Sequence, residues 1–194
     1  IGVQNNLSRV LLTSSLKGLQ SELPLPFSKL ADETVNLRFE MKDLQAGQRS
    51  LLLHYGSLLN ANLLALKDDE GVWEVERGNV NFGNVAKNAD KDGLWLTGTL
   101  PQLSLEGWGG LAGALGGNSD GATIGIAGAD FSIQKMTGYG YGINNFHVRA
   151  NSRNDILTAQ LASRELNGEL SWQPDDMQGH GRLIARLKNL DFIM

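Results

Sequence analysis

The sequence predicts a mainly β protein, an elongated and curled antiparallel sheet, and two observations support this prediction. Apolar and polar residues alternate with a period of two, most clearly where Val35, Leu37, Phe39 and Met41 are separated by polar residues. The chain also contains 24 glycines and only 20% charged residues. That composition is typical of a turn-rich β protein and not of a helical bundle.

Short alternating or apolar runs follow one another along the chain, separated by polar or glycine-containing turns. Clear turns are predicted at 45–48, 67–71 and 90–93. Strands that follow one another with so little between them indicate an antiparallel meander. The predicted strands are 34–42, 51–55, 58–66, 72–82, 94–100, 123–133, 141–150, 156–162, 165–172 and 181–192.

A helix is predicted only near 106–115, where Trp108, Leu111 and Leu115 recur at spacings of three and four. Several glycines in this stretch weaken its helix propensity. A flexible glycine-rich loop follows at 116–121. We therefore expect one β-rich segment over 1–194, with a subdivision near that loop.

Little helix is available to cover the second face of the sheet, and two arrangements follow. A long curled sheet would present its apolar face as a trough, since an antiparallel sheet can leave one face in water. Two sheets packed face to face would instead bury the same residues as a core. Composition alone favours the sandwich.

If the sheet is a trough, the strand periodicity predicts which residues line it. A register error of one residue would move a whole strand to the opposite face. The predicted lining residues are Val35, Leu37, Phe39, Leu51, Leu53, Leu59, Leu63, Leu94, Leu96, Phe146, Val148, Leu157, Leu161, Leu183 and Leu187.

Charge and composition exclude several classes of function. The formal net charge is −4, and no basic stripe is present, so we expect no nucleic-acid partner. The absence of cysteine excludes disulfides and cysteine-ligated zinc. The sequence contains no run of 18 apolar residues, which is about the length needed to span a bilayer. The chain opens at Ile1 and stops at Met194 directly after a strand-like run, so we expect it to be a piece of a longer protein whose anchor lies elsewhere.

No arrangement of side chains predicts catalysis or a cofactor. His54, His147 and His180 belong to no metal-ligand motif. No Gly-x-Ser-x-Gly context for a nucleophilic serine is present. We expect no catalytic residue, no metal and no cofactor, and we interpret the chain as a non-enzyme.

Three segments resemble the YhdP branch of the AsmA-like family, in order and spacing over about residues 13–190. The first contains S-L-K-G-L at 15–19, followed by L-P-L-P-F-S-K at 23–29. The second is G-L-W-L-T-G-T-L-P at 93–101. The third is L-N-G-E-L-S-W at 166–172, followed by G-R-L-I-A-R-L at 181–187. They are similar to the C-terminal half of these long proteins.

The resemblance implies a fold and a role. AsmA-like proteins of this branch are thought to be tethered to the inner membrane of Gram-negative bacteria. Their repeated β units are thought to form a long curled sheet that passes phospholipids through the periplasm to the outer membrane. Phospholipids would then be the partners, and both membranes would be contacted through parts outside this fragment. No catalytic residues are known in the family, so the resemblance implies none.

Two other functions stay open at this stage. A periplasmic β-scaffold could act by protein–protein interaction, either as a sealed sandwich or by pairing its edge strands with a partner. An envelope hydrolase ranks third, because the sequence offers no converging catalytic groups. Exposed edge strands would also favour an edge-strand dimer of the isolated piece.

Overall fold

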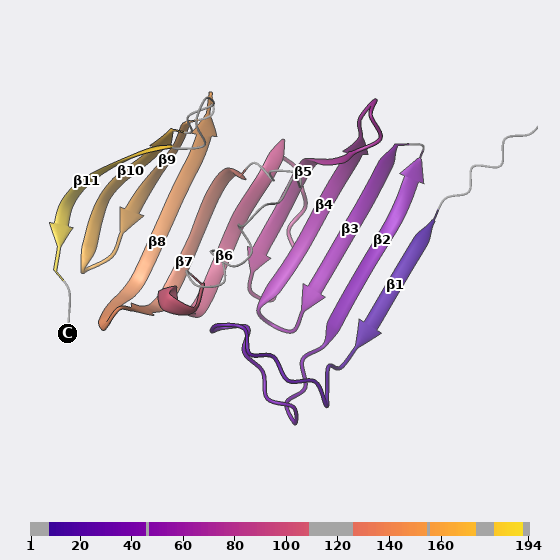
Figure 1. Cartoon of the computed structure of the whole chain (residues 1–194), viewed down its shortest axis with the longest axis horizontal. Helices are drawn as coiled ribbons and strands as arrows, with labels where there is room; N and C mark the ends of the chain where they lie inside the picture. Colours follow the sequence, from indigo (N-terminus) through magenta and orange to yellow (C-terminus); the bar gives the residue numbers. More distant parts are fainter. Residues whose placement is uncertain (1–7, 46, 109–125, 155, 174–180, 192–194) are drawn as a thin grey trace, which may run out of the picture.

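The chain folds into one open sheet of eleven strands in the computed structural model, which describes residues 8–45, 47–108, 126–154, 156–173 and 181–191 (Figure 1). A short helical turn at 105–108 accompanies the sheet. The strands are β1 (Arg9–Ser14), β2 (Leu37–Gln45), β3 (Gln48–Tyr55), β4 (Leu59–Lys67), β5 (Trp73–Phe82), β6 (Gly93–Ser104), β7 (Ile126–Gly138), β8 (Tyr141–Arg153), β9 (Ile156–Ala162), β10 (Leu166–Gln173) and β11 (Arg182–Leu190).

Strand order in the sheet follows chain order, from β1 at one edge to β11 at the other. The predicted mainly β, curled sheet is confirmed, but the predicted antiparallel pairing does not hold throughout. Its pairings are antiparallel except at β5–β6 and β6–β7, which are parallel. Parallel neighbours require a connection long enough to return to the starting end. The segments 83–92 and 105–125 supply that length, whereas a tight turn would have produced the predicted meander throughout.

The strand prediction omits β1 and places the other strands close to their observed positions. β1 contains Val10, Leu11 and Leu12 in succession, so it shows no alternation. The predicted helix is present at 105–108, and its remainder at 109–115 lies outside the described residues. The predicted subdivision at 116–121 also lies outside them. β6 and β7, which flank it, pair side by side in the one sheet.

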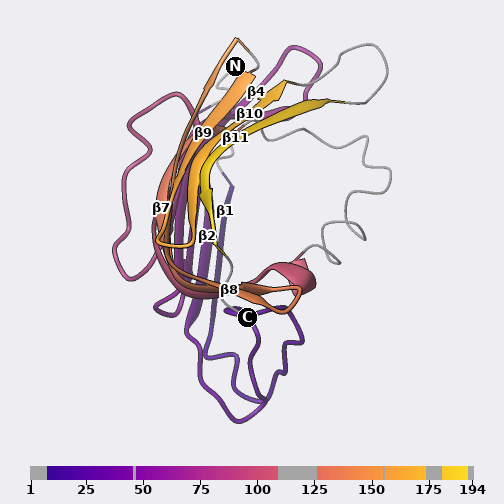
Figure 2. The ribbon, with the colours of Figure 1, turned by 90° about the vertical axis from the view of Figure 1, so that its left-hand side faces the viewer.

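The strands are bent, so that one face of the sheet is concave and the other is convex (Figure 2). The turn at 105–108 lies inside the curve, and the connection 83–92 lies outside it. β1 and β11 are opposite edges and do not pair with each other. The described strands thus make neither a closed barrel nor a two-sheet sandwich. No helix among the described residues is long and apolar enough to cross a bilayer.

A compact core forms on the concave side where β6 to β9 meet. Ile133 is 2% exposed and packs in a cluster of buried apolar side chains from these strands. Phe82 of β5 and Phe131 of β7 meet at its border with ring centroids 5.6 Å apart. The other buried members are Leu100, Met136, Ile143, Phe146 and Leu161.

Gly98 allows the parallel strands β5 and β6 to approach each other closely. Its φ is +102°, and a Cβ at this position would lie 2.1 Å from the carbonyl oxygen of Phe82. Only glycine fits this combination of left-handed backbone and close approach. The parallel pairing therefore depends on Gly98.

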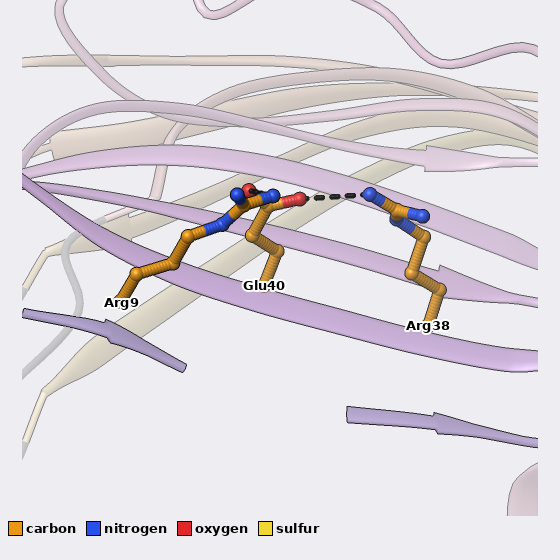
Figure 3. Close-up of polar contacts among 3 residues, drawn as sticks. All are labelled: Arg9, Arg38 and Glu40. Atoms are coloured by element: carbon orange, nitrogen blue, oxygen red, sulfur yellow. Dashed lines mark hydrogen bonds and ion pairs between the residues drawn. The ribbon is translucent and has the colours of Figure 1, made fainter. Parts of the chain in front are cut away.

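An ion pair on the convex face joins β1 to β2, and a second ion pair within β2 shares the same carboxylate. Arg9 of β1 and Arg38 of β2 both contact the Glu40 carboxylate, at 2.8 and 2.9 Å (Figure 3). The hydrogen bond from Arg38, together with the charge of Arg9, holds the pKa of Glu40 below its usual value. Because these ion pairs are accessible to solvent, they add little to the stability of the fold and act mainly on how β1 pairs with β2.

Glu165 anchors the turn between β9 and β10 to β8. The residue is 2% exposed, and its carboxylate accepts hydrogen bonds from the backbone and side-chain N–H groups of Asn144, each at 3.2 Å. Burial disfavours the charged form, but these hydrogen bonds outweigh it and lower the pKa of Glu165.

The lowered pKa makes Glu165 a source of acid sensitivity. A carboxylate whose pKa is lower in the folded state stabilises the fold above its unfolded pKa, here about 4.5, and this contribution is lost as the pH falls through the folded value. We predict that Glu165→Gln is less stable than the native protein at pH 7 and that the difference shrinks toward pH 3.

Urea unfolding at several pH values measures this difference. Glu169→Gln is the matched control, because the Glu169 side chain on β10 is 44% exposed and its ion pair with Arg186, at 3.8 Å, contributes little. A stability difference between Glu165→Gln and the native protein that stayed constant from pH 7 to pH 3 would contradict this account.

Candidate functional site

An unbroken apolar row crosses the sheet from one edge to the other. Residues directly opposite each other in a ladder point to the same face, so the register can be followed from strand to strand. One such row contains no polar residue on any of the eleven strands. In order from β1 to β11 it consists of Leu12, Phe39, Leu53, Ala61, Val80, Leu96, Ala129, Ala150, Ala159, Leu170 and Ala185.

Rows on either side of this central row are also apolar over most of their length. Toward the 105–108 end, the neighbouring row has only Ser14 and Tyr55 as polar members. It consists of Ser14, Leu37, Tyr55, Leu59, Phe82, Gly98, Phe131, Val148, Leu161, Gly168 and Leu187. On the other side lie Val10, Met41, Leu51, Leu63, Gly78 and Leu94, and beyond them Ser152, Leu157, Trp172 and Leu183. We call these rows together the apolar track.

The opposite face of the same strands is polar. Its ladder row consists of Thr13, Arg38, His54, Asn60, Asn81, Thr97, Asp130, Arg149, Gln160, Glu169 and Arg186. Lys87 and Lys91 of the outer 83–92 connection border a cavity together with members of this row. Leu105, from the turn inside the curve, borders a cavity with Met136 and Ile143 of the core. The polar face is therefore convex and the apolar track concave (Figure 2).

The register places the predicted lining residues together on this concave face, with Val35 as the exception. Val35 precedes β2, where its N–H donates to the carbonyl of Ser15 and its side chain approaches Gly56. The others all belong to the apolar track: Leu37, Phe39, Leu51, Leu53, Leu59, Leu63, Leu94, Leu96, Phe146, Val148, Leu157, Leu161, Leu183 and Leu187. Phe146 pairs with Ile133, which lies two residues beyond Phe131 on the same face, and so extends the track by one row on β7 and β8.

Sequence reasoning missed the small and edge members of the track. Ala129, Ala150 and Ala159 follow one another in the central row, and Leu12 extends the row onto β1. The alanines of β8 and β9 also follow the two-residue period. Periodicity extended to small residues would therefore have found them.

Exposure rises from the middle of the track to both edges. Ala129 and Ala150 are each 5% exposed, whereas Leu12 is 51% and Leu183 is 62% exposed. Eleven strands at a spacing of about 4.8 Å make the track about 48 Å long. The apolar surface therefore runs along the whole sheet and is open at both edge strands.

The segment between β1 and β2 folds against one end of the strands and borders an open cavity of about 380 Å³. Its ring of Phe27 lies 5.8 Å from Tyr55 of β3 and 5.7 Å from Trp108 of the helical turn, centroid to centroid. The Trp108 indole donates to the carbonyl of Leu25 at 3.0 Å. These contacts connect the 15–36 segment to the 105–108 turn along one margin of the concave face.

The described histidines are satisfied polar groups of the convex face. His54 Nδ1 lies 2.7 Å from Asn60 Oδ1, and His147 Nδ1 lies 2.9 Å from the Ser132 hydroxyl. His147 also lies 3.3 Å from Asp130. Among the residues that the structure describes, no group of His, Cys, Asp or Glu side chains is arranged to hold a metal ion. His180 lies outside them.

These features define a class of protein, an open β-sheet with a continuous apolar concave face and a polar convex face. A model of the YhdP protein family matches residues 1–193, and the chain belongs to that family, the YhdP branch of AsmA-like proteins. This is a family of cell-envelope proteins. Searches of curated proteins and of solved structures found no match.

The buried middle of the concave face and its open part should respond differently to truncation. We predict that Ile133→Ala costs about 2–5 kcal/mol of unfolding free energy, because it leaves a cavity among closely packed neighbours. Leu53→Ala should cost less than about half as much, because Leu53 is only half-buried on the open face.

Urea unfolding of both variants measures this contrast, with Leu52→Ala on the convex face as the control. Equal losses at Ile133 and Leu53 would mean that the track is a sealed core.

Proposed function

We propose that the apolar track is the wall of a groove that shields phospholipid acyl chains as they pass between the inner and outer membranes. The observation that supports this most strongly is the central row, which carries an apolar residue on every strand. Membership of the YhdP family also supports it.

The free energy of transferring an acyl chain into water explains why an unbroken apolar row would favour lipid passage. Each CH₂ moved from apolar surroundings into water costs about 0.8 kcal/mol, so a chain of about 16 carbons costs on the order of 10 kcal/mol. An acyl chain spans one leaflet, about 15 Å, or half of the hydrocarbon core. A track of about 48 Å is about three times that length. A lipid sliding along it would exchange one apolar contact for another without crossing water.

The chemistry of the track favours transfer over catalysis. Its lining offers few hydrogen-bonding groups, mainly Ser14, Tyr55 and Ser152, so it would hold acyl chains without selecting among them. In this proposal the chain is not an enzyme and needs no cofactor. It acts in the periplasm, and contact with the two membranes is made by other parts of the longer protein.

A scaffold function is the second candidate, and the edge strands favour it. Val10 and Leu12 of β1 are 46% and 51% exposed, and Leu183 and Leu187 of β11 are 62% and 43% exposed. Such edges can add strands from a partner. A scaffold of this kind would depend on the edge backbone and would tolerate polar residues in the middle of the track.

Photo-crosslinking in cells distinguishes the two functions. A photoreactive residue at Phe39, Leu53, Leu96 or Val148 of the intact protein would lie in the track. Controls one residue away, at Glu40, Leu52, Thr97 and His147, would lie on the convex face.

We predict phospholipid adducts, identified by mass spectrometry, at the four track positions and at none of the controls. The pair Leu53 and Leu52 is the sharpest comparison, because both are leucines on one strand. Absence of lipid at all eight positions in folded, abundant protein would favour the scaffold.

A further inference from the structure

The 380 Å³ cavity beside the track combines an apolar wall with a buried cation. The sheet contributes Leu37, Leu53, Tyr55 and Leu59, and the 15–36 segment forms the other wall of this open cavity. The volume lies within the range of about 300–1,000 Å³ found for small-molecule sites. The lining from the segment is Leu16, Leu19, Gln20, Ser21, Leu23, Phe27 and Lys29.

Of the residues that the structure describes, Lys29 is the only lysine or arginine that borders this cavity, and it is 4% exposed. Its ammonium donates to the carbonyls of Leu19 and Leu30, at 2.7 and 2.8 Å. A lysine ammonium has three donors. Among the described residues no carboxylate forms an ion pair with Lys29, so two neutral carbonyls are its partners there.

Glu33 is an acidic residue of the same segment. Its carboxylate accepts the N–H of Leu30 at 2.8 Å. Burial, aided by the charge of Glu33, raises the pKa of Tyr55, which lines the cavity. Lys29, and not Tyr55, is therefore the described group at this cavity that would favour an anion.

Burying a charge costs free energy unless an opposite charge pairs with it. An anion delivered by a ligand would supply that pairing while its apolar portion filled the leucine-lined space. The complementary ligand thus has one negatively charged head and one acyl chain.

The cavity is continuous with the apolar track. Leu53 belongs to the central row and also lines the cavity, and Leu37 and Leu59 belong to the neighbouring row. An acyl chain lying in the track at β2 to β4 therefore has an apolar path into the cavity.

We propose that the cavity between the 15–36 segment and β2 to β4 is a side pocket for a single-chain anionic lipid, with Lys29 pairing its head group. This proposal rests on the proposed function, because it takes the track as the source of the lipid. It adds a charge preference at one place in a groove that otherwise makes no distinction between lipids.

A photoreactive palmitate tests the charge preference, and a hexadecanol carrying the same photoreactive group provides the uncharged comparison. Both would be applied to the purified intact protein, and the labelled peptides would be mapped by mass spectrometry. The variants are Lys29→Met, which keeps much of the stem and removes the charge, and Lys29→Arg, which keeps the charge. Lys17→Met, an exposed lysine of the same segment, is the control.

We expect palmitate to label the 15–36 segment about tenfold less in Lys29→Met than in the native protein, with Lys29→Arg and Lys17→Met close to native. Hexadecanol should label native and Lys29→Met protein alike. Equal palmitate labelling of native and Lys29→Met protein would overturn the proposal.

A purely structural role of Lys29 has a different signature. Lys29→Met would then reduce labelling by both probes equally. It would also speed hydrogen exchange at the amides of Gly18 and Ser21, which bond to Ala31 and Lys29 across the segment. That outcome would also overturn the proposal. Labelling of β6 to β8 reports on the track separately, and its absence in every variant would count against the proposed function itself.

Discussion

In-register pairing across all eleven strands is the constraint on which the rest of the structure depends. Side chains alternate between faces along a strand, so a slip of one residue at any ladder would turn that strand's leucines to the convex side. The bulges between Leu64 and Ala65 and between Leu94 and Trp95 show how the sheet absorbs irregularity. Each bulge adds a residue to one strand. The central row crosses the same strands away from the bulges, where Ala61 pairs with Val80 and Leu96 pairs with Ala129.

The open face has to remain apolar without collapsing onto itself. The compact core on β6 to β9, with Ile133 at its centre, gives the sheet a packed region that does not depend on a second layer. Polar interactions of the convex face and of the turns, such as Glu40 with its arginines and Glu165 with Asn144, add specificity of pairing. The middle of the track is thus part of the packed region that holds the fold, while the track is exposed toward both edge strands.

Much of this could be predicted from the sequence, and the misses have physical causes. Alternation placed Phe39, Leu53 and Leu96 on one face because a half-buried strand has only two sides. β1 was missed because its successive apolar residues show no alternation. The parallel pairings were missed because a connection's path depends on tertiary packing. Lys29 was likewise out of reach, since its burial arises from carbonyls brought together by the fold.

A scan of single aspartates along the central row tests the account most directly. Ala61→Asp, Val80→Asp, Leu96→Asp and Ala150→Asp would each break the apolar continuity at a different strand, and Thr97→Asp would place the same charge on the convex face. Phospholipid delivery to the outer membrane would be measured with each variant of the intact protein at matched abundance and stability. The account predicts that every break in the row abolishes delivery, whichever strand carries it, and that Thr97→Asp leaves it intact. Normal delivery with a charge in the middle of the row would contradict the account.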